Sequence, residues 1–277
     1  MIFVDYMKRG LITFLLLLSA FDNAMAQSGR MSRGIVAENE VMRSAMFGAG
    51  AANVMDSYLS PYNYKGMNMR LVRETMRMTK LCNGKVSNQT LMDFNLSYLE
   101  NRTNTAEEWA GGIRYGIGWH YHFRDVGRFG LLGGLSVAGN LGGIYNTRNG
   151  NNPAQAKVDV TINASAMVLY GLTLCGKEVQ MRYQVSAPFA GVAFSPNYGQ
   201  SYYEIFSLGH YDANVVFAHI GNMPSMRHLL TADIPLGRHV LRVGYMGQFD
   251  QSTFNNLRYH SYTHNFLVGY VKYFNRK

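Results

Sequence analysis

Two histidines, His120 and His122, stand two positions apart, which places both rings on one face of an extended strand. Imidazoles in that arrangement could ligate a metal ion, and Asp125 follows in the next turn as an oxygen donor. No further histidine or cysteine cluster can be assigned to their neighbourhood. Hydrogen bonding to neighbours is the commoner role of such histidines, so we assign no metal site and no cofactor.

A second group of residues has the types that acid–base hydrolysis uses. Its members flank two predicted loops, with Asp250, Ser252, His260 and His264 around one and His210 and Asp212 in the other. No nucleophile motif accompanies them, and solvated loop residues explain the same pattern. We therefore assign no catalytic residue and keep a hydrolase as the least favoured alternative.

The elements that hold these residues are predicted β-strands with two different faces. From 109 to 123 the odd positions are mostly aromatic or branched, while the even positions carry Arg114, His120 and His122 among small residues. One face is as apolar as a bilayer requires, and the pattern exceeds the roughly 9 to 11 residues with which a tilted strand spans hydrocarbon. The sequence therefore predicts a transmembrane antiparallel up-and-down β-barrel, an all-β fold.

Alternation predicts about ten strands in this barrel. They cover residues 45–55, 67–80, 88–100, 109–123, 127–145, 158–174, 178–194, 226–234, 240–250 and 261–274. The connections alternate between short turns at 81–87, 124–126, 175–177 and 236–239 and long loops at 56–66, 101–108, 146–157, 195–225 and 251–260. Bacterial barrels have short periplasmic turns and longer outer loops, so both termini of the chain are expected in the periplasm.

Two stretches leave details of this barrel open. Residues 202–206 and 214–217 could pair as a hairpin, which would raise the count to twelve strands. In the strand at 67–80, Arg70, Arg73, Glu74 and Arg77 cannot share one face, and we expect a bulge near Val72.

The inward-facing charges are expected to fill the barrel, because about ten strands enclose only a narrow interior. The predicted polar network consists of Asp93, Arg114, Asp159, Arg182, Arg242 and Asp250. We expect the three arginines to pair with the three aspartates in a closed interior. A narrow channel or ligand conduit, porin-like in character, is the alternative.

The long loop at 195–225 is the candidate surface for recognition. Tyr202, Tyr203, Phe206 and Tyr211 offer rigid amphipathic contact area to an extracellular ligand or protein. Tyrosines near a membrane interface also simply form an aromatic girdle.

The N-terminal residues match an export signal. Lys8 and Arg9 precede an apolar run, and Ala24-Met25-Ala26 matches a cleavage site, which predicts a signal peptide at 1–26. We then expect a periplasmic extension at 27–43 and the outer-membrane barrel at 44–277. Cys82 and Cys175 fall in short turns far apart around the barrel, which favours two separate thiols over a disulfide.

Charge and the last strand indicate which partners to expect. The net charge of +9 comes from scattered basic residues with no basic run, which argues against nucleic acid and fits contact with outer-membrane lipid. The alternate positions Phe266, Val268, Tyr270 and Phe274 resemble the aromatic C-terminal strand that barrel-assembly machinery recognises, although Lys272 interrupts them.

Three segments carry a family resemblance: 53–61 (NVMDSYLSP), 73–77 (RETMR) and 203–212 (YEIFSLGHYD). With them the chain resembles an uncharacterised outer-membrane family of Bacteroidota, known only as a domain of unknown function. The resemblance implies a secreted outer-membrane protein and supplies no catalytic residue, ligand or partner. We expect a structural or surface-interaction role.

Overall fold

The computed structural model describes residues 36, 40–126, 128–150, 152–174, 176–237 and 239–275. The expected signal peptide at 1–26, most of the expected extension at 27–43 and Cys175 lie outside them. The elements are β1 (Glu40–Asp56), β2 (Ser60–Met78), β3 (Val86–Asn101), β4 (Glu107–Val126), β5 (Phe129–Asn146), β6 (Ala154–Leu174), β7 (Lys177–Phe194), α2 (Tyr202–Phe206), β8 (Val215–His219), β9 (Met226–Leu236), β10 (His239–Phe254) and β11 (Leu257–Asn275).

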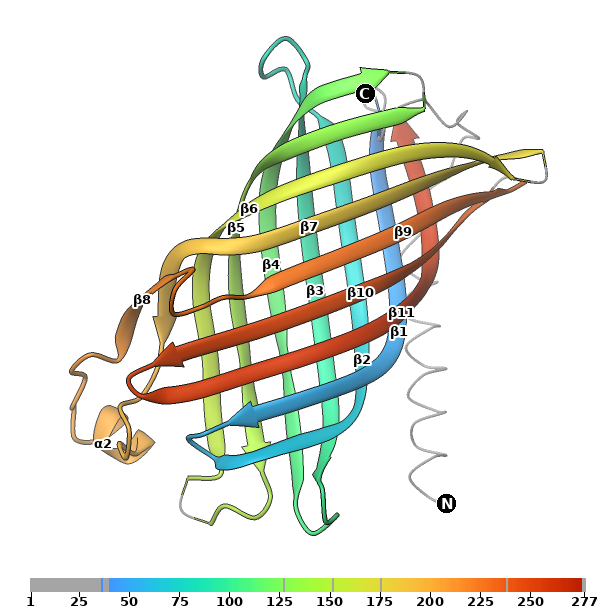
Figure 1. The fold of residues 1–277 in the computed structure, drawn as a ribbon. Helices are drawn as coiled ribbons and strands as arrows, with labels where there is room; N and C mark the ends of the chain where they lie inside the picture. The colour runs from blue at the N-terminus through green and yellow to red at the C-terminus, as the bar shows by residue number, and fades with distance from the viewer. Residues whose placement is uncertain are drawn as a thin grey trace.

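These strands form one antiparallel sheet that closes on itself (Figure 1). Consecutive strands pair around the wall, β1 pairs with β11, and the β6–β7 pairing completes the ring. Both β8 and β9 pair with β7, β8 along 190–194 and β9 along 180–186, so the two lie in line. Within the described residues the wall therefore has ten strand positions, which confirms the predicted barrel of about ten strands.

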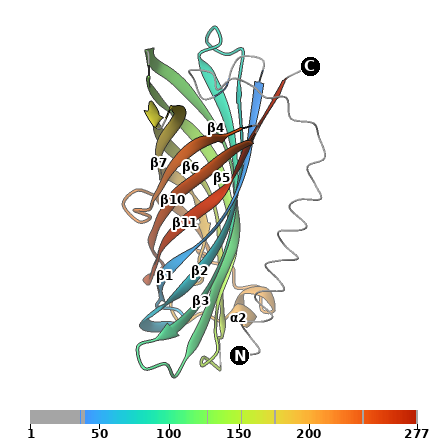
Figure 2. The ribbon, with the colours of Figure 1, turned by 90° about the vertical axis from the view of Figure 1, so that its right-hand side faces the viewer.

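The alternative of twelve strands is wrong, because residues 202–206 form the helix α2 and only 215–219 joins the sheet. In Figures 1 and 2, α2 lies beside one end of the barrel, connected to the wall through β8. Asn222 covers the free edge of β8: the His219 N–H donates to its side-chain oxygen at 2.8 Å, and its amide donates to the Phe217 carbonyl at 2.9 Å. An open strand edge is thereby blocked.

Two of the loops expected to be long are tight turns. The expected loop at 251–260 is a hairpin whose two turn residues, Asn255 and Asn256, both have positive φ. Asparagine tolerates this conformation, and two such residues form the turn that fits twisted strands. The expected loop at 56–66 shrinks in the same way to residues 57–59.

The bulge expected near Val72 is also absent, because β2 pairs with β3 in unbroken register from Tyr64 to Met78. Strict alternation places Arg70 and Glu74 inward and leaves Arg73 and Arg77 exposed on the outer wall. Arg70 and Glu74 therefore lie on one face of β2, Arg73 and Arg77 on the other, and no bulge is needed to accommodate them.

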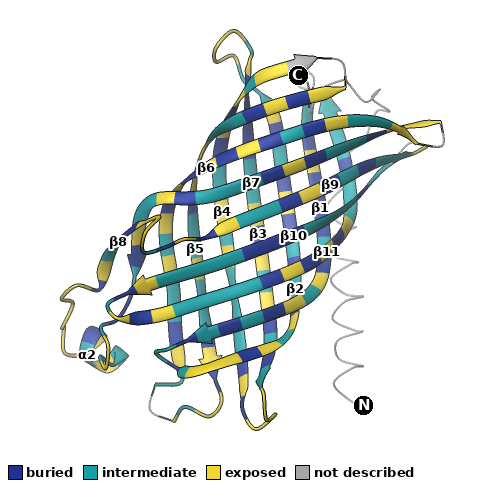
Figure 3. Ribbon diagram, viewed as in Figure 1, coloured by how far each residue is buried: buried dark blue, intermediate teal, exposed yellow. Residues whose placement is uncertain are grey.

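Burial alternates along the strands, as Figure 3 shows by colour. The outward residues of β3 are apolar from Met92 to Tyr98, with Thr90 on one side and Glu100 on the other. Outward residues of β10 behave likewise from Leu241 to Phe249. The band covers seven residues on β3 and nine on β10, close to the span of about 9 to 11 residues that a tilted strand needs to cross hydrocarbon. Among the described residues, no helix is long and apolar enough to cross a membrane.

Candidate functional site

The interior nearest the short turns is closed by apolar side chains. This end is called the turn end, and the opposite end, which carries α2, the loop end. The interior of the turn end is filled by a buried cluster formed by Val36, Met42, Met76, Leu132, Met167, Leu169 and Val271. Val36 precedes the first strand and is only 6% exposed, so the chain before β1 also contributes to the closure.

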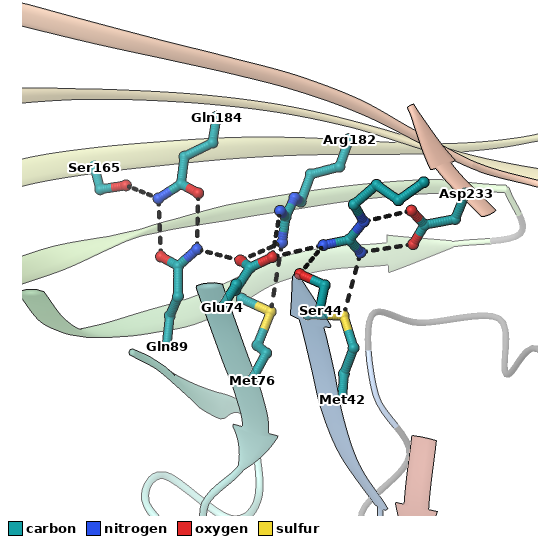
Figure 4. A network of polar contacts seen from close by, with 10 residues as sticks. Met42, Ser44, Glu74, Met76, Gln89, Ser165, Arg182, Gln184 and Asp233 are labelled. Atoms are coloured by element: carbon teal, nitrogen blue, oxygen red, sulfur yellow. Dashed lines mark hydrogen bonds and ion pairs between the residues drawn. The ribbon is translucent and has the colours of Figure 1, made fainter. Parts of the chain in front are cut away.

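Above this layer, Glu74 is the centre of a buried ion-pair network (Figure 4). Its two carboxylate oxygens accept hydrogen bonds from Arg182 Nη1 and Nη2, each at 2.7 Å, and from Arg242 Nη1 at 2.7 Å. Arg242 also binds Asp233 through two nitrogens, at 2.6 and 2.7 Å. Two guanidinium groups and two carboxylates therefore neutralise one another.

Neutral side chains extend this network across the lumen. Gln89 donates to Glu74 at 2.6 Å, exchanges hydrogen bonds of 2.9 Å with Gln184, and Gln184 donates to Ser165 at 3.1 Å. His120 is fully buried nearby, and neither ring nitrogen has a hydrogen-bond partner among the described residues. In the Glu74 network the charged groups are therefore paired with one another, and the side chains fill the lumen at this level.

A second ion-pair network lies nearer the loop end. Arg70 Nη1 donates to Asp93 at 2.9 Å and to Gln248 at 2.8 Å, and Arg227 lies 3.4 Å from the same Asp93 oxygen. An apolar cluster of Met46, Val72, Leu229, Met246 and Leu267 separates it from the first network. The interior thus alternates apolar and charged layers.

Two small cavities lie in the interior, of about 50 and 60 Å³, and both are lined by Arg114 and Asp250. The first also reaches Gln89 and Gln184 of the Glu74 network. Arg114 donates to Thr161 and Asn163, each at 3.3 Å. Asp159 lines the second cavity and accepts from Asn140 at 3.1 Å. Both cavities have room for a small polar ligand beside Arg114 and Asp250.

The six predicted network residues all point inward, but their partners differ from those expected. Arg182 and Arg242 share Glu74 rather than pairing with Asp93, Asp159 or Asp250. Asp93 pairs with Arg70, and Arg114 makes neutral hydrogen bonds. Sequence reasoning left Glu74 and Arg70 out of the network because it placed a bulge between them. Their spacing of four, on alternate inward positions, was the available signal.

Of the four aromatic residues predicted for recognition, one is anchored and three are exposed. Tyr202 donates to Gln155 at 2.8 Å, accepts from the Ala156 N–H at 2.7 Å, and packs edge-on against Tyr58. By contrast, Tyr203, Phe206 and Tyr211 are 66%, 66% and 63% exposed. The loop therefore presents aromatic surface from a fixed base.

Local interactions hold that base. Ser201 caps α2 by accepting from the Glu204 N–H, while the Glu204 carboxylate accepts from the Ser201 backbone and hydroxyl. These hydrogen bonds lower the pKa of Glu204. Burial, with the neighbouring Tyr202 and Asp56, raises the pKa of Tyr58 to about 12, so its hydroxyl stays protonated and donates to the Gln200 carbonyl at 3.0 Å.

Asp250 and Ser252 line the same cavity, but the structure does not bring the histidines among the hydrolase candidates to them. Asp250 points inward, whereas His260 stacks on Tyr262 and His264 contacts the Tyr245 hydroxyl on the outer wall. His210 is an exposed loop residue. Among the described residues, no group of three or more His, Cys, Asp or Glu side chains could hold a metal ion.

Three solved structures of outer-membrane or autotransporter proteins are similar to this chain at low identity. The transport unit of the autotransporter AIDA-I from Escherichia coli is similar with a TM-score of 0.48 and 8% identity, over 91% of this chain and 93% of that one. The outer membrane protease OmpT from Escherichia coli scores 0.43 with 7% identity, over 90% and 100%. The translocator domain of NalP from Neisseria meningitidis scores 0.37 with 12% identity, over 96% and 95%.

No curated protein matches the chain. A family model does, and it agrees with the resemblance to an uncharacterised family. It is described as "Protein of unknown function (DUF3316)" and matches residues 12–276, so the chain belongs to that family.

Proposed function

We propose that the protein is a non-conducting barrel of a Gram-negative outer membrane, exported by a cleaved signal peptide, and that its loop end makes surface interactions. The observation that carries this proposal is the filled interior. Ions would have to cross an apolar layer around Met42 and Met76, then the Glu74 network, then the Arg70–Asp93 layer. Desolvating an ion in such layers is costly, because their charged groups already satisfy one another.

The apolar outer band supports the membrane location. Its length fits hydrocarbon, and the family resemblance extends the proposal to Bacteroidota as the source. Short turns and both ends of the barrel wall share one end, as in bacterial barrels whose turns face the periplasm. The end that carries α2 would then face the exterior.

Exposed aromatic residues support the surface role. Tyr203, Phe206 and Tyr211 project from a loop whose base is fixed by the Ser201–Glu204 cap and by Tyr202. Rigid aromatic side chains supply contact area at low cost in conformational entropy, and such residues dominate binding surfaces.

A small ligand conduit is the second candidate, favoured by the two cavities beside Arg114 and Asp250. A ligand could enter these from the loop end only, since the Glu74 layer closes the path beyond. Such a pocket would be a binding site rather than a channel.

Two experiments test the proposal. Proteoliposomes that contain the refolded protein should not swell in isosmotic solutions of small sugars, whereas a porin in the same vesicles should; swelling would contradict a closed interior. In intact cells, Phe206→Cys in a Cys82→Ser/Cys175→Ser background, where it supplies the only thiol, should react with a membrane-impermeant maleimide. Failure to react, with reaction after lysis, would contradict an outward-facing α2.

A further inference from the structure

A cluster of cations lies on the outer wall near the turn end, where β11, β1 and β2 run side by side. Arg43 on β1 stands directly opposite Lys272 on β11 and opposite Thr75 on β2. Arg73 and Arg77 lie two positions to either side of Thr75, so both are diagonal neighbours of Arg43. The three arginines are exposed, and the side chain of each lies on the outward face of its strand.

In the described parts of β1, β2 and β11, no acidic side chain shares the outward face with the three arginines. In the described parts of these strands, Glu40 and Asp56 on β1 and Glu74 on β2 occupy inward positions, and β11 contains no acid. No ion pair joins any of the three arginines to a described acidic residue. Arg43 has two like charges diagonal to it on β2, which is unfavourable between neighbouring strands, so an anion on this face would stabilise the three arginines.

The cluster lies where the apolar band ends. Toward the loop end the next outward residues are apolar on all three strands: Ala45 and Phe47 on β1, Leu71 on β2, and Tyr270 and Val268 on β11. The Arg43 guanidinium lies 5.3 Å from the centroid of the Phe274 ring, and Lys272 Nζ lies 5.3 Å from that of Tyr270. Aromatic rings at this level are typical of the membrane–water interface.

Depth explains why such cations are tolerated on a lipid-facing wall. A lipid-facing Arg or Lys costs about 2 to 4 kcal/mol at the bilayer midplane but about 0 to 1 near the interface. Guanidinium groups at that level meet lipid phosphates, which they bind through paired N–H donors.

We propose that Arg43, Arg73 and Arg77 bind the phosphate of an anionic phospholipid in the leaflet at the turn end. Its acyl chains lie along the adjacent apolar wall over Phe47, Leu71 and Val268. This inference rests on the proposed membrane location and adds a specific lipid site to it.

The test compares lipid retention by native mass spectrometry. Wild-type protein and the Arg43→Gln/Arg73→Gln variant are refolded into nanodiscs of phosphatidylethanolamine and phosphatidylglycerol and then released into mild detergent. The matched control, Lys65→Gln/Arg258→Gln, removes two exposed cations from the loop ends of β2 and β11. Lys65 already faces Glu100 across the β2–β3 pair. Heat-modifiable migration on gels confirms that each protein is a folded barrel.

We expect wild type and the control to retain phosphatidylglycerol, and the turn-end variant to bind it more weakly by about fivefold per arginine removed. Arg43→Lys/Arg73→Lys, which keeps both charges, should recover most of the binding. Equal losses in the turn-end variant and the control would overturn the site in favour of net charge alone, as would undiminished retention by the turn-end variant. Failure of wild type to insert into nanodiscs would instead contradict the membrane location.

Discussion

Replacing Glu74 by alanine should destabilise the barrel strongly. The substitution removes the only carboxylate bound to Arg182 in the described interior, whereas Arg242 keeps its two hydrogen bonds to Asp233. One buried guanidinium is therefore left without a counter-charge. Breaking a buried pair by removing one partner costs about 3 to 5 kcal/mol, and we expect the free energy of unfolding to fall by that amount.

A double variant separates this mechanism from simple loss of packing. Glu74→Gln alone keeps the side-chain shape but still leaves Arg182 without a counter-charge. Glu74→Gln/Arg182→Met removes both charges and leaves the Arg242–Asp233 pair complete. The double variant should therefore be more stable than Glu74→Gln, with a coupling energy of about 1 to 3 kcal/mol.

The assay is equilibrium unfolding in urea in lipid vesicles, followed by the fluorescence of the two tryptophans. Glu100→Gln, which removes an acid at the rim, serves as the control and should change stability by less than about 1 kcal/mol. If the costs of Glu74→Gln and Arg182→Met simply add, the two side chains are not coupled and the reasoning is refuted.

Three further predictions concern the ends of the barrel. Cys82 is an exposed free thiol in the β2–β3 turn, so in intact cells an impermeant maleimide should label it only after the outer membrane is permeabilised; labelling of untreated cells would reverse the orientation. Asn222→Ala should uncover the β8 edge and promote self-association at high concentration, measured by analytical ultracentrifugation, and an unchanged monomer fraction would show that the edge is protected otherwise. The pKa of Glu204 is lowered, so its carboxylate favours the folded cap above the ordinary glutamate pKa, and this contribution is lost as pH falls through the lowered value. The Ser201 amide NMR signal should shift in that acidic range in wild type and not in Glu204→Gln.

Much of the barrel follows from alternation in the sequence, because each strand has one face in a polar interior and one on an apolar exterior. That is why Trp109 to Phe123 predicts β4 so directly, and why all six network residues point inward. The ends of the strands were harder to predict from the sequence, because the position of a turn depends on only one or two residues. The Asn255-Asn256 dipeptide is a hairpin signal, because asparagine tolerates positive φ, and the predicted long loop at 251–260 did not take it into account.

The partners inside the barrel were not predictable in the same way. Glu74 and Arg182 are 108 residues apart and meet because of how far each strand is offset from its neighbours around the wall. Alternation along a strand predicts which side chains face inward, but it does not predict where along the barrel axis each of them lies. The helix α2 is too short for a periodic signal, although Ser201 and Glu204 form a capping box that identifies its start.

The most direct test of a closed barrel is single-channel recording from the refolded protein in planar bilayers, with heat-modifiable migration as evidence of folding. The wild-type barrel should insert without producing discrete current steps, because layered side chains fill its lumen from Met42 to Asp93. Stable steps in wild type whose size changes in Arg182→Ala would show that ions pass the Glu74 layer. That result would contradict a filled, non-conducting interior.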